Sequence, residues 1–196
     1  MRLFVALTPP AEVLDDIDEA VRALADLADV DECYRWTVRS QWHITLAFLG
    51  QVDEEMLPDL RRRLARAAAR HPAMALRVAG GGGFGSVRRA RVLWAGVTGD
   101  VGPLRGLARS VAAAARRSGV ELDERTRFRP HVTLARLHEP IDVRAAVDVL
   151  DAARGRLWEA REIALVESRL GQGEDRRSLY DTIATWPLGG RRPTDG

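Results

Sequence analysis

The 196-residue sequence contains a single cysteine, Cys33. One cysteine cannot form an internal disulfide, and it cannot supply the several thiolates of a cysteine-built metal site. A lone cysteine is more often a small apolar filler or an inert surface thiol than a catalytic nucleophile. The chemistry of this protein is therefore expected to use other side chains.

Long apolar runs are also missing from the chain. No stretch approaches the roughly 20 apolar residues that a transmembrane helix needs. The apolar opening stretch, residues 2–7, is too short for the core of a signal peptide, and Asp15 and Asp16 follow soon after it. We expect a soluble cytoplasmic protein that does not contact a membrane.

The sequence also lacks a large excess of one charge, because it contains 30 Lys and Arg residues and 28 Asp and Glu residues. Any attraction for a polyanion must therefore come from a local patch rather than from the formal net charge of +2. With 46% hydrophobic residues, the chain can bury the core of one large domain or of two small lobes.

A glycine-rich stretch, residues 80–85, lacks the Gly-Lys-Ser/Thr ending of a phosphate-binding P-loop. It separates two expected strands, residues 74–79 and 91–97. The sequence therefore favours a flexible turn between two strands over a phosphate cradle.

A short motif that occurs twice is the most informative feature of the sequence. His43-Ile44-Thr45-Leu46 returns 88 residues later as His131-Val132-Thr133-Leu134. In a strand, side chains two residues apart lie on the same face, so each copy presents an imidazole beside a hydroxyl. The alternate apolar residues point the other way and can be buried.

The surrounding pattern repeats with the same offset. A helix expected over residues 10–29 would return at 98–117, where the apolar spacing independently predicts another helix. Each half then reads helix, His-x-Thr strand, helix, strand, strand. We expect an α+β fold of two intertwined lobes related by a pseudo-twofold axis, each an antiparallel sheet flanked by helices, with a cleft between them. Residues 1–188 form this single bilobal domain, and the tail, residues 189–196, has no apolar anchor and is expected to be disordered.

Two facing histidines suit acid-base chemistry on a phosphodiester. With an ordinary pKa of about 6.5, one imidazole can act as a neutral base while the other acts as a charged acid. Thr45 and Thr133 can donate to the non-bridging phosphate oxygens and stabilise the charge of the transition state. A metal site would need a third histidine or a nearby carboxylate, and serine catalysis would need an exposed nucleophile; the motifs supply neither.

Three neighbouring side chains are candidates for substrate contacts. Arg129 lies on the same strand face as His131, whereas Arg136 falls on the opposite face unless the strand end twists. Phe48 could stack on a base, but it has the parity of the buried residues, which favours core packing. The other two histidines, His71 and His138, lack a partner threonine and are expected at the surface.

The two motifs in their context, residues 43–50 and 128–136, resemble the signatures of the two-histidine (2H) phosphoesterases. Within that superfamily the sequence is similar to bacterial RNA 2',3'-cyclic phosphodiesterases, also called 2'-5' RNA ligases, over essentially the whole chain. The resemblance implies metal-independent opening of a terminal 2',3'-cyclic phosphate to a 2'-phosphomonoester. It further implies that His43 is the proton donor and His131 the proton acceptor, an order that the nearly symmetric motifs do not fix by themselves.

The resemblance also implies that no cofactor is needed, and that the reverse reaction would join a cyclic end to a 5'-hydroxyl. The expected partner is an RNA or oligonucleotide with a 2',3'-cyclic phosphate end, and the expected state is a monomer. Two alternatives remain open: a 2H phosphodiesterase for another cyclic or 2'-5' nucleotide, and an RNA- or nucleotide-binding module without turnover.

Overall fold

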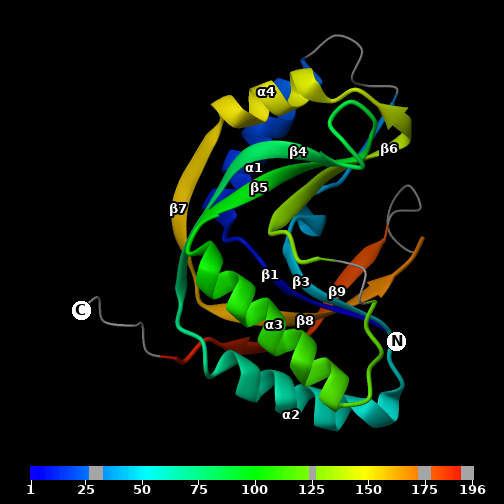
Figure 1. The fold of residues 1–196 in the computed structure, drawn as a ribbon, viewed down its shortest axis with the longest axis vertical. Helices are drawn as coiled ribbons and strands as arrows, with labels where there is room; N and C mark the ends of the chain where they lie inside the picture. Colours follow the sequence, from blue (N-terminus) through cyan, green and yellow to red (C-terminus); the bar gives the residue numbers. More distant parts are fainter. Residues whose placement is uncertain (27–32, 124–126, 172–177, 191–196) are drawn as a thin grey trace.

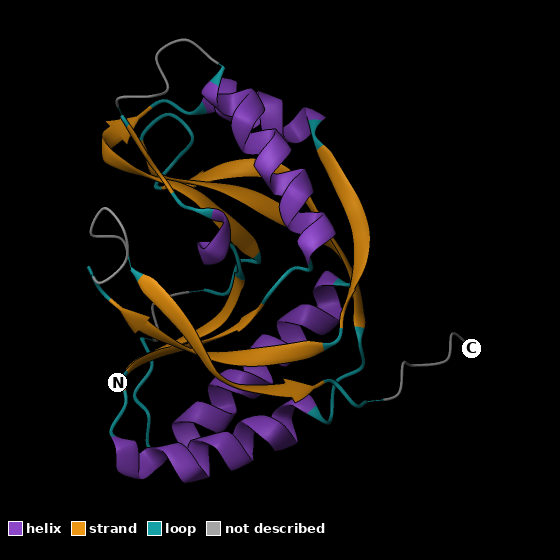
Figure 2. Cartoon of the chain, turned by 180° about the vertical axis from the view of Figure 1, so that it is seen from behind, coloured by secondary structure: helices purple, strands orange, loops and turns teal. Residues whose placement is uncertain are grey.

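The computed structural model describes residues 1–26, 33–123, 127–171 and 178–190 (Figure 1). Within these ranges, nine strands form one antiparallel sheet that curls strongly, and two α-helices pack against each of its halves (Figures 1 and 2). The α+β class expected from the sequence is confirmed. Among the described residues, no helix combines the length and the apolarity needed to span a bilayer.

The strands are β1 (Arg2–Leu7), β2 (Tyr34–Trp36), β3 (Ile44–Gln51), β4 (Met74–Phe84), β5 (Ala90–Gly99), β6 (His131–Ile141), β7 (Arg154–Ala160), β8 (Glu162–Arg169) and β9 (Leu179–Pro187). The α-helices are α1 (Ala11–Ala25), α2 (Leu57–Ala68), α3 (Val101–Arg117) and α4 (Arg144–Ala152), and two 3-10 turns are η1 (Arg39–Gln41) and η2 (Glu54–Met56).

The two His-x-Thr strands meet at the centre of the sheet. The strand order is β7-β4-β5-β6-β3-β1-β8-β9, with β2 also paired to β6. The two halves join where β3 pairs with β6 through one registered pair, Ile44 with Val132. These two residues hold equivalent positions in the repeats, 88 residues apart. The pseudo-twofold axis therefore passes between them.

The two repeats exchange elements between the halves of the sheet. Strand β5 comes from the first repeat but pairs with β6 of the second, whereas β8 comes from the second repeat but pairs with β1, next to the first motif strand β3. Helices α1 and α4 pack together with β7 and β4, and α2 and α3 pack together with β9 and β3 (Figures 1 and 2). The lobes are thus intertwined.

The helices follow the apolar stripes of the sequence. Helix α1 buries Val13, Ile17 and Leu24, while Ala28, the last expected member of its stripe, lies outside the described residues. Helix α3 ends two residues before Gly119, whose φ of +89° favours glycine at a helix end.

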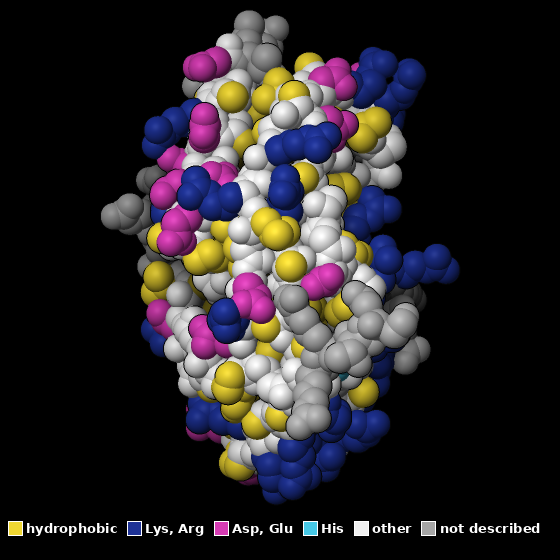
Figure 3. Space-filling model, turned by 90° about the vertical axis from the view of Figure 1, so that its left-hand side faces the viewer, with side chains coloured by type: hydrophobic (Ala, Val, Ile, Leu, Met, Phe, Trp, Pro, Cys, Tyr) yellow, Lys and Arg dark blue, Asp and Glu magenta, His cyan; other side chains and the backbone are white. Residues whose placement is uncertain are grey.

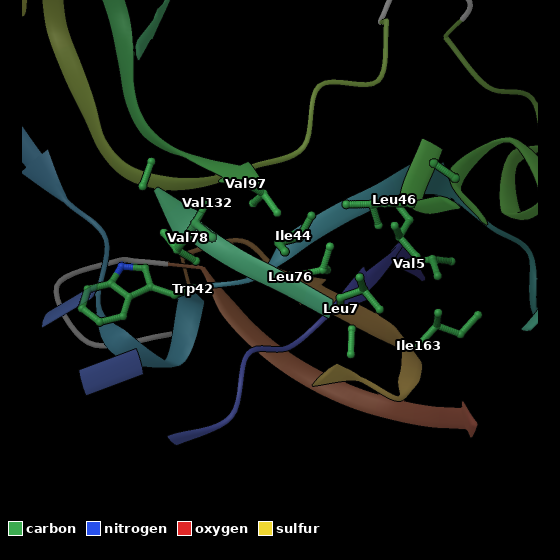
Figure 4. Close-up of a cluster of buried hydrophobic side chains, with 14 of the residues drawn as sticks. Val5, Leu7, Trp42, Ile44, Leu46, Leu76, Val78, Val97, Val132 and Ile163 are labelled. Carbon is green, nitrogen blue, oxygen red and sulfur yellow. The ribbon is translucent and has the colours of Figure 1, made fainter. Parts of the chain in front are cut away.

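The strand alternation holds at the two motifs. Ile44, Leu46 and Val132 are buried in one apolar cluster between the sheet halves (Figure 4), and Leu134 is buried with them. The opposite parity leaves His43, Thr45, His131 and Thr133 only partly buried. One face of each strand is therefore core, and the other is free for chemistry.

The expected glycine turn is wrong, because residues 80–83 belong to β4. Gly81, Gly82 and Gly83 pair with Ala95, Trp94 and Leu93 of β5. A Cβ on Gly82 would lie 2.2 Å from the Trp94 ring, and one on Gly81 would lie 2.7 Å from the Leu150 side chain. Glycine is needed here for close packing rather than for a turn.

Strand β7 is an element that the sequence analysis did not expect. In its described burial pattern, only Trp158 and Ala160 are buried, so the strand lacks an apolar alternation along its length. Of the expected tail, residues 191–196 lie outside the described ranges, and the Gly190 N–H donates to the His71 carbonyl oxygen at 2.9 Å.

The surface on one side of the molecule carries basic and acidic side chains in alternation over much of its height, with basic side chains gathered at its lower end (Figure 3). This mixture agrees with the near balance of charge in the sequence.

Candidate active site

The structure brings both His-x-Thr pairs to one cavity. His43, Thr45, His131 and Thr133 all line a space of about 270 Å³ where the halves of the sheet meet. His43 directly precedes β3, and His131 is the first residue of β6. The single registered pair between the strands thus places two like motifs on opposite sides of one opening.

The two imidazoles are held in the same way. Nδ1 of His43 lies 2.6 Å from the Gln41 carbonyl oxygen, and Nδ1 of His131 lies 2.6 Å from the Arg129 carbonyl oxygen. A carbonyl only accepts hydrogen bonds, so Nδ1 must carry the proton in both rings. The neutral tautomer then leaves the lone pair on Nε2, where it can take a proton from a substrate or from water.

Aromatic rings fix the orientation of each imidazole, but differently. Phe4 stacks on His43 with ring centroids 4.7 Å apart, and Tyr180 meets the same imidazole edge-on at 5.4 Å. Phe84 meets His131 edge-on at 4.8 Å. Sequence reasoning missed Phe4 and Phe84, because neither lies near a motif in the sequence.

Burial keeps both imidazoles neutral in the free protein. The pKa of His43 is lowered to about 4, chiefly by burial and also by the nearby charges of His131 and Arg136, against the opposing effect of the Gln41 carbonyl. Burial also lowers the pKa of His131, and the guanidinium groups of Arg129 and Arg136 act in the same direction. Both rings therefore need a negative charge close by before they bind a second proton at neutral pH.

A threonine outside the motifs ties the segment before β3 to β6. The Thr37 hydroxyl donates a hydrogen bond shared between the carbonyl oxygens of Thr133 and Leu134, each 2.8 Å away. It also accepts a hydrogen bond from Trp42 Nε1 at 2.9 Å. The chain leading into His43 is thereby held against the strand that carries Thr133. This positioning role was not visible in the sequence, because Thr37 has no motif of its own.

A second, larger cavity of about 650 Å³ opens beside the first. The two cavities share five lining residues: Thr45, Phe48, His131, Thr133 and Arg136. The larger cavity is further lined by four arginines, Arg109, Arg116, Arg127 and Arg129. A phosphate held between the motifs would therefore have access to both spaces.

Arg136 turns toward the site, against simple alternation. In the pairing of β5 with β6, Trp94 faces Thr133 and Leu93 faces Ala135, so Leu134 is skipped. This irregularity reverses the parity of the strand beyond Thr133 and places Arg136 on both cavities. Simple strand alternation places Arg136 on the opposite face unless the strand end twists, and the irregular pairing is the local distortion that brings it to the site face.

Phe48 is not a core residue, so the interpretation favoured by its parity is wrong. The pairing of β1 with β3 skips Leu46 in the same way, since Ala6 faces Thr45 and Val5 faces Ala47. Phe48 is consequently 62% exposed and lines both cavities. It is available to contact a substrate.

The remaining candidate residues, Arg129, His71 and His138, differ in whether they line the two cavities. Arg129 lines the larger cavity but not the smaller one, and its guanidinium carbon lies 5.5 Å from the Trp94 ring centroid. His138 is exposed as expected, whereas His71 is partly buried and its Nε2 lies 2.8 Å from the Ser110 hydroxyl. Neither of these histidines lines the two cavities.

A metal centre finds no donor set in the described part of the chain. Across those residues, no three or more His, Cys, Asp or Glu side chains gather closely enough to hold an ion. The site instead offers two imidazoles, two hydroxyls and a guanidinium, which suit an anion of tetrahedral phosphorus.

Comparison with known proteins points to one family. The profile of the 2'-5' RNA ligase superfamily matches residues 9–172. An RNA 2',3'-cyclic phosphodiesterase of Escherichia coli is 30% identical over 187 residues, which cover 95% of this chain and 96% of that protein. One of Geobacillus stearothermophilus is 33% identical over 78% of this chain, and the match spans 47% of the relative's length.

Solved structures agree with these sequence matches. TT0787 of Thermus thermophilus superposes with a TM-score of 0.76 at 28% identity, over 98% of this chain and 100% of that one. LigT of E. coli complexed with 3'-AMP gives a TM-score of 0.70 at 28% identity, over 95% and 96% of the two chains. With its duplicated His-x-Thr strands meeting at one cavity, this chain belongs to the 2'-5' RNA ligase superfamily.

Proposed function

We propose that this protein is an RNA 2',3'-cyclic phosphodiesterase, which opens a terminal cyclic phosphate to a 2'-phosphomonoester. The observation that carries the proposal is the matched pair of imidazoles on one cavity, each with Nδ1 bound to a backbone carbonyl and each two residues before a threonine. The family relatives from E. coli and G. stearothermophilus that bear this name support it.

The reaction exchanges one P–O bond for another. His131 Nε2 takes a proton from water, whose oxygen attacks the phosphorus atom. The bond from phosphorus to the 3' oxygen breaks, and His43 gives that oxygen its proton. The products are a 2'-phosphate and a 3'-hydroxyl. This division of labour follows the assignment carried over from the family.

Charge on the phosphate is handled by neighbouring side chains. Thr45 and Thr133 donate their hydroxyls to the non-bridging oxygens, and Arg136 faces the same oxygens from its place on both cavities. Arg129 and Phe48 complete the set of proposed substrate contacts, the first for phosphate and the second for a nucleobase.

The low pKa of His43 makes substrate charge part of the mechanism. In the free protein, an imidazole with a pKa of about 4 is neutral at pH 7 and has no proton to give. A phosphate anion bound beside the ring favours its charged form and raises this pKa. We infer that the substrate itself charges its acid catalyst.

Product analysis tests the proposal. The wild-type protein, treated with EDTA, is incubated with an oligoribonucleotide ending in a 2',3'-cyclic phosphate, and the 2'- and 3'-phosphate products are separated. We expect the 2'-phosphate alone, and no product from a variant with both His43→Ala and His131→Ala. His138→Ala serves as the matched control and should retain full activity. Turnover by the double variant at the wild-type rate would overturn the assignment of the site.

A further inference from the structure

We propose that the larger cavity, between α3 and the motif strands β3 and β6, binds the RNA strand on the 5' side of the cyclic phosphate. The inference rests on the proposed function and adds where the rest of the substrate lies. It makes Arg109 and Arg116 of α3 substrate-binding residues and predicts a preference for oligonucleotides over cyclic mononucleotides.

The junction of the two cavities restricts the arrangement. Because both are lined by Thr45, His131, Thr133 and Arg136, a phosphate held there has one cavity on each side. An RNA end has one strand leaving its terminal nucleotide, so one cavity receives the strand. The 3' oxygen of the terminal ribose faces His43 in the smaller cavity. Water, or in the reverse direction a 5'-hydroxyl, approaches the phosphorus from the side of His131, which lines both cavities.

Charge selects the larger cavity for the strand. Among the described residues, its lining includes the guanidinium groups of Arg109, Arg116, Arg127 and Arg129 and one carboxylate, that of Asp123. In the described portions of the chain, Arg109, Arg116 and Arg127 form no ion pair with a carboxylate. Their charges therefore remain available for phosphodiester groups.

The smaller cavity lacks this character. Among the described residues of its lining, Arg35 is the one arginine besides the shared Arg136, and the rest of the polar wall includes Gln41, Ser178 and Tyr180. Its volume of about 270 Å³ compares with about 650 Å³ for the larger cavity. The small polar space beside His43 suits the 3' oxygen of the terminal ribose, whereas the larger space falls within the roughly 300–1,000 Å³ of typical ligand pockets.

Helix α3 presents its arginines at a spacing that suits a chain of phosphates. Arg109 and Arg116 are seven residues apart, which is about two turns and about 10.5 Å along the helix axis. This distance is longer than a single phosphate group, so the two arginines can contact different phosphates of one strand. Ala108 and Ala112 line the same wall, so the surface beside the two arginines is partly apolar. A strand can thus lie along α3 with its sugars over the alanines.

The exposed ring of Phe48 adds a stacking surface at the junction. It lies on both cavities, and its own neighbour Phe4, 6.2 Å away, supports it from the side of His43. Stacking on an aromatic ring accepts any base and is worth about 1–3 kcal/mol per base. Arginines for the backbone and an aromatic ring for a base form a combination typical of single-strand binding without sequence preference.

The experiment compares two double variants of α3. Arg109→Ala with Arg116→Ala removes two cavity arginines, whereas Arg105→Ala with Arg117→Ala removes two exposed arginines of the same helix that line neither cavity. Both variants lose the same net charge, and alanine favours the helix in both. For each protein, kcat/KM is measured on a trinucleotide and on a mononucleotide, both ending in a 2',3'-cyclic phosphate.

We expect the wild-type protein to prefer the trinucleotide. In the cavity variant, the ratio of the two kcat/KM values should fall by roughly tenfold, equivalent to about 1.4 kcal/mol. The control variant should keep the wild-type ratio. An unchanged ratio in the cavity variant, or the same fall in both variants, would overturn the inference.

A binding measurement separates this inference from the proposed function. Fluorescence anisotropy with a labelled trinucleotide ending in a 3'-phosphate needs no turnover. The cavity variant should bind roughly tenfold more weakly, and the slope of log affinity against log salt should decrease by about 1.4, or about 0.7 for each lost phosphate contact. If the wild type binds in this way but opens no cyclic phosphate, the proposed function fails and the subsite stands. If the wild type opens the trinucleotide and the mononucleotide equally well and the cavity variant binds the trinucleotide as tightly as the wild type, the proposed function stands and the subsite fails.

Discussion

The two motif strands are copies of one design with different neighbours. Each has a histidine bound through Nδ1 to a carbonyl two residues earlier, a threonine two residues later, and an irregular pairing that skips the next leucine. Those skipped residues, Leu46 and Leu134, are again 88 residues apart. The residues that follow at equivalent positions, Phe48 and Arg136, both turn toward the cavities.

The duplicated backbone therefore presents an aromatic ring from one strand and a guanidinium from the other. His43 is stacked on Phe4, while His131 meets Phe84 edge-on and a tilted Trp94 ring, and opens onto both cavities. Shared geometry allows both imidazoles to reach one phosphate. The different neighbours allow them to take different parts in the reaction.

Removing either imidazole alone should have the largest effect on the reaction. His43→Gln and His131→Gln should each lower kcat by roughly 10²–10⁴-fold, the usual range for general acid-base catalysis. The pH profiles should differ: without the proton donor the fall at high pH disappears, and without the acceptor the fall at low pH disappears. Measuring kcat/KM against pH for both variants decides the roles, and the opposite pattern would exchange them.

Removing one hydroxyl should cost less. Thr45→Val and Thr133→Val keep the shape and lose the donor, so each should lower kcat by about 10²-fold with little change in KM. If the pseudo-twofold symmetry extends to the transition state, the two losses should be similar. A variant that raises KM and leaves kcat unchanged would assign its threonine to ground-state binding instead.

The equivalent pair Phe48 and Arg136 should separate binding from chemistry. Phe48→Leu should chiefly raise KM, because about 1–3 kcal/mol of base stacking is lost. Arg136→Met should chiefly lower kcat and should also raise the pKa of both histidines, since its charge lowers both in the wild type. Steady-state kinetics and NMR titration of the imidazoles test this contrast. Identical kinetic effects of the two variants would contradict it.

The pH dependence of the wild type follows from the lowered pKa values. Both free imidazoles have a pKa below the ordinary 6.5, so the maximum of kcat/KM should lie below pH 6.5. Bound phosphate raises the pKa of both rings, so the maximum of kcat should lie at higher pH. Coincident maxima would show that the substrate charge does not act on the histidines.

The smallest expected effect is on stability. The unfolded chain binds a proton at His43 near pH 6.5, whereas the folded protein resists it down to about pH 4. The folded state is therefore progressively destabilised as the pH falls from 6.5 to 4, by an amount on the order of 1–3 kcal/mol. Urea unfolding at pH 7 and pH 4.5 should show a smaller loss in His43→Gln than in the wild type.

Some features could be predicted from the sequence because they depend on local periodicity. Apolar spacing of three and four residues predicts the stripe of α1, and alternation predicts the buried Ile44 and Val132. The shared offset of 88 residues predicted the duplication. The glycines of β4 misled because their reason is contact with Trp94 and Leu150, residues far away in the sequence.

The sequence by itself determined the pairs of chemical groups, since a histidine and a threonine two residues apart share a face in any strand. The positions of Phe48 and Arg136 were decided only by the tertiary structure, because the irregular pairing with β1 and β5 reverses their parity. The same holds for the stacking of Phe4 on His43 and for the arginines of α3 beside β6. Strand register and the exchange of elements between repeats are set by contacts over long sequence separations, and local periodicity contains no record of them.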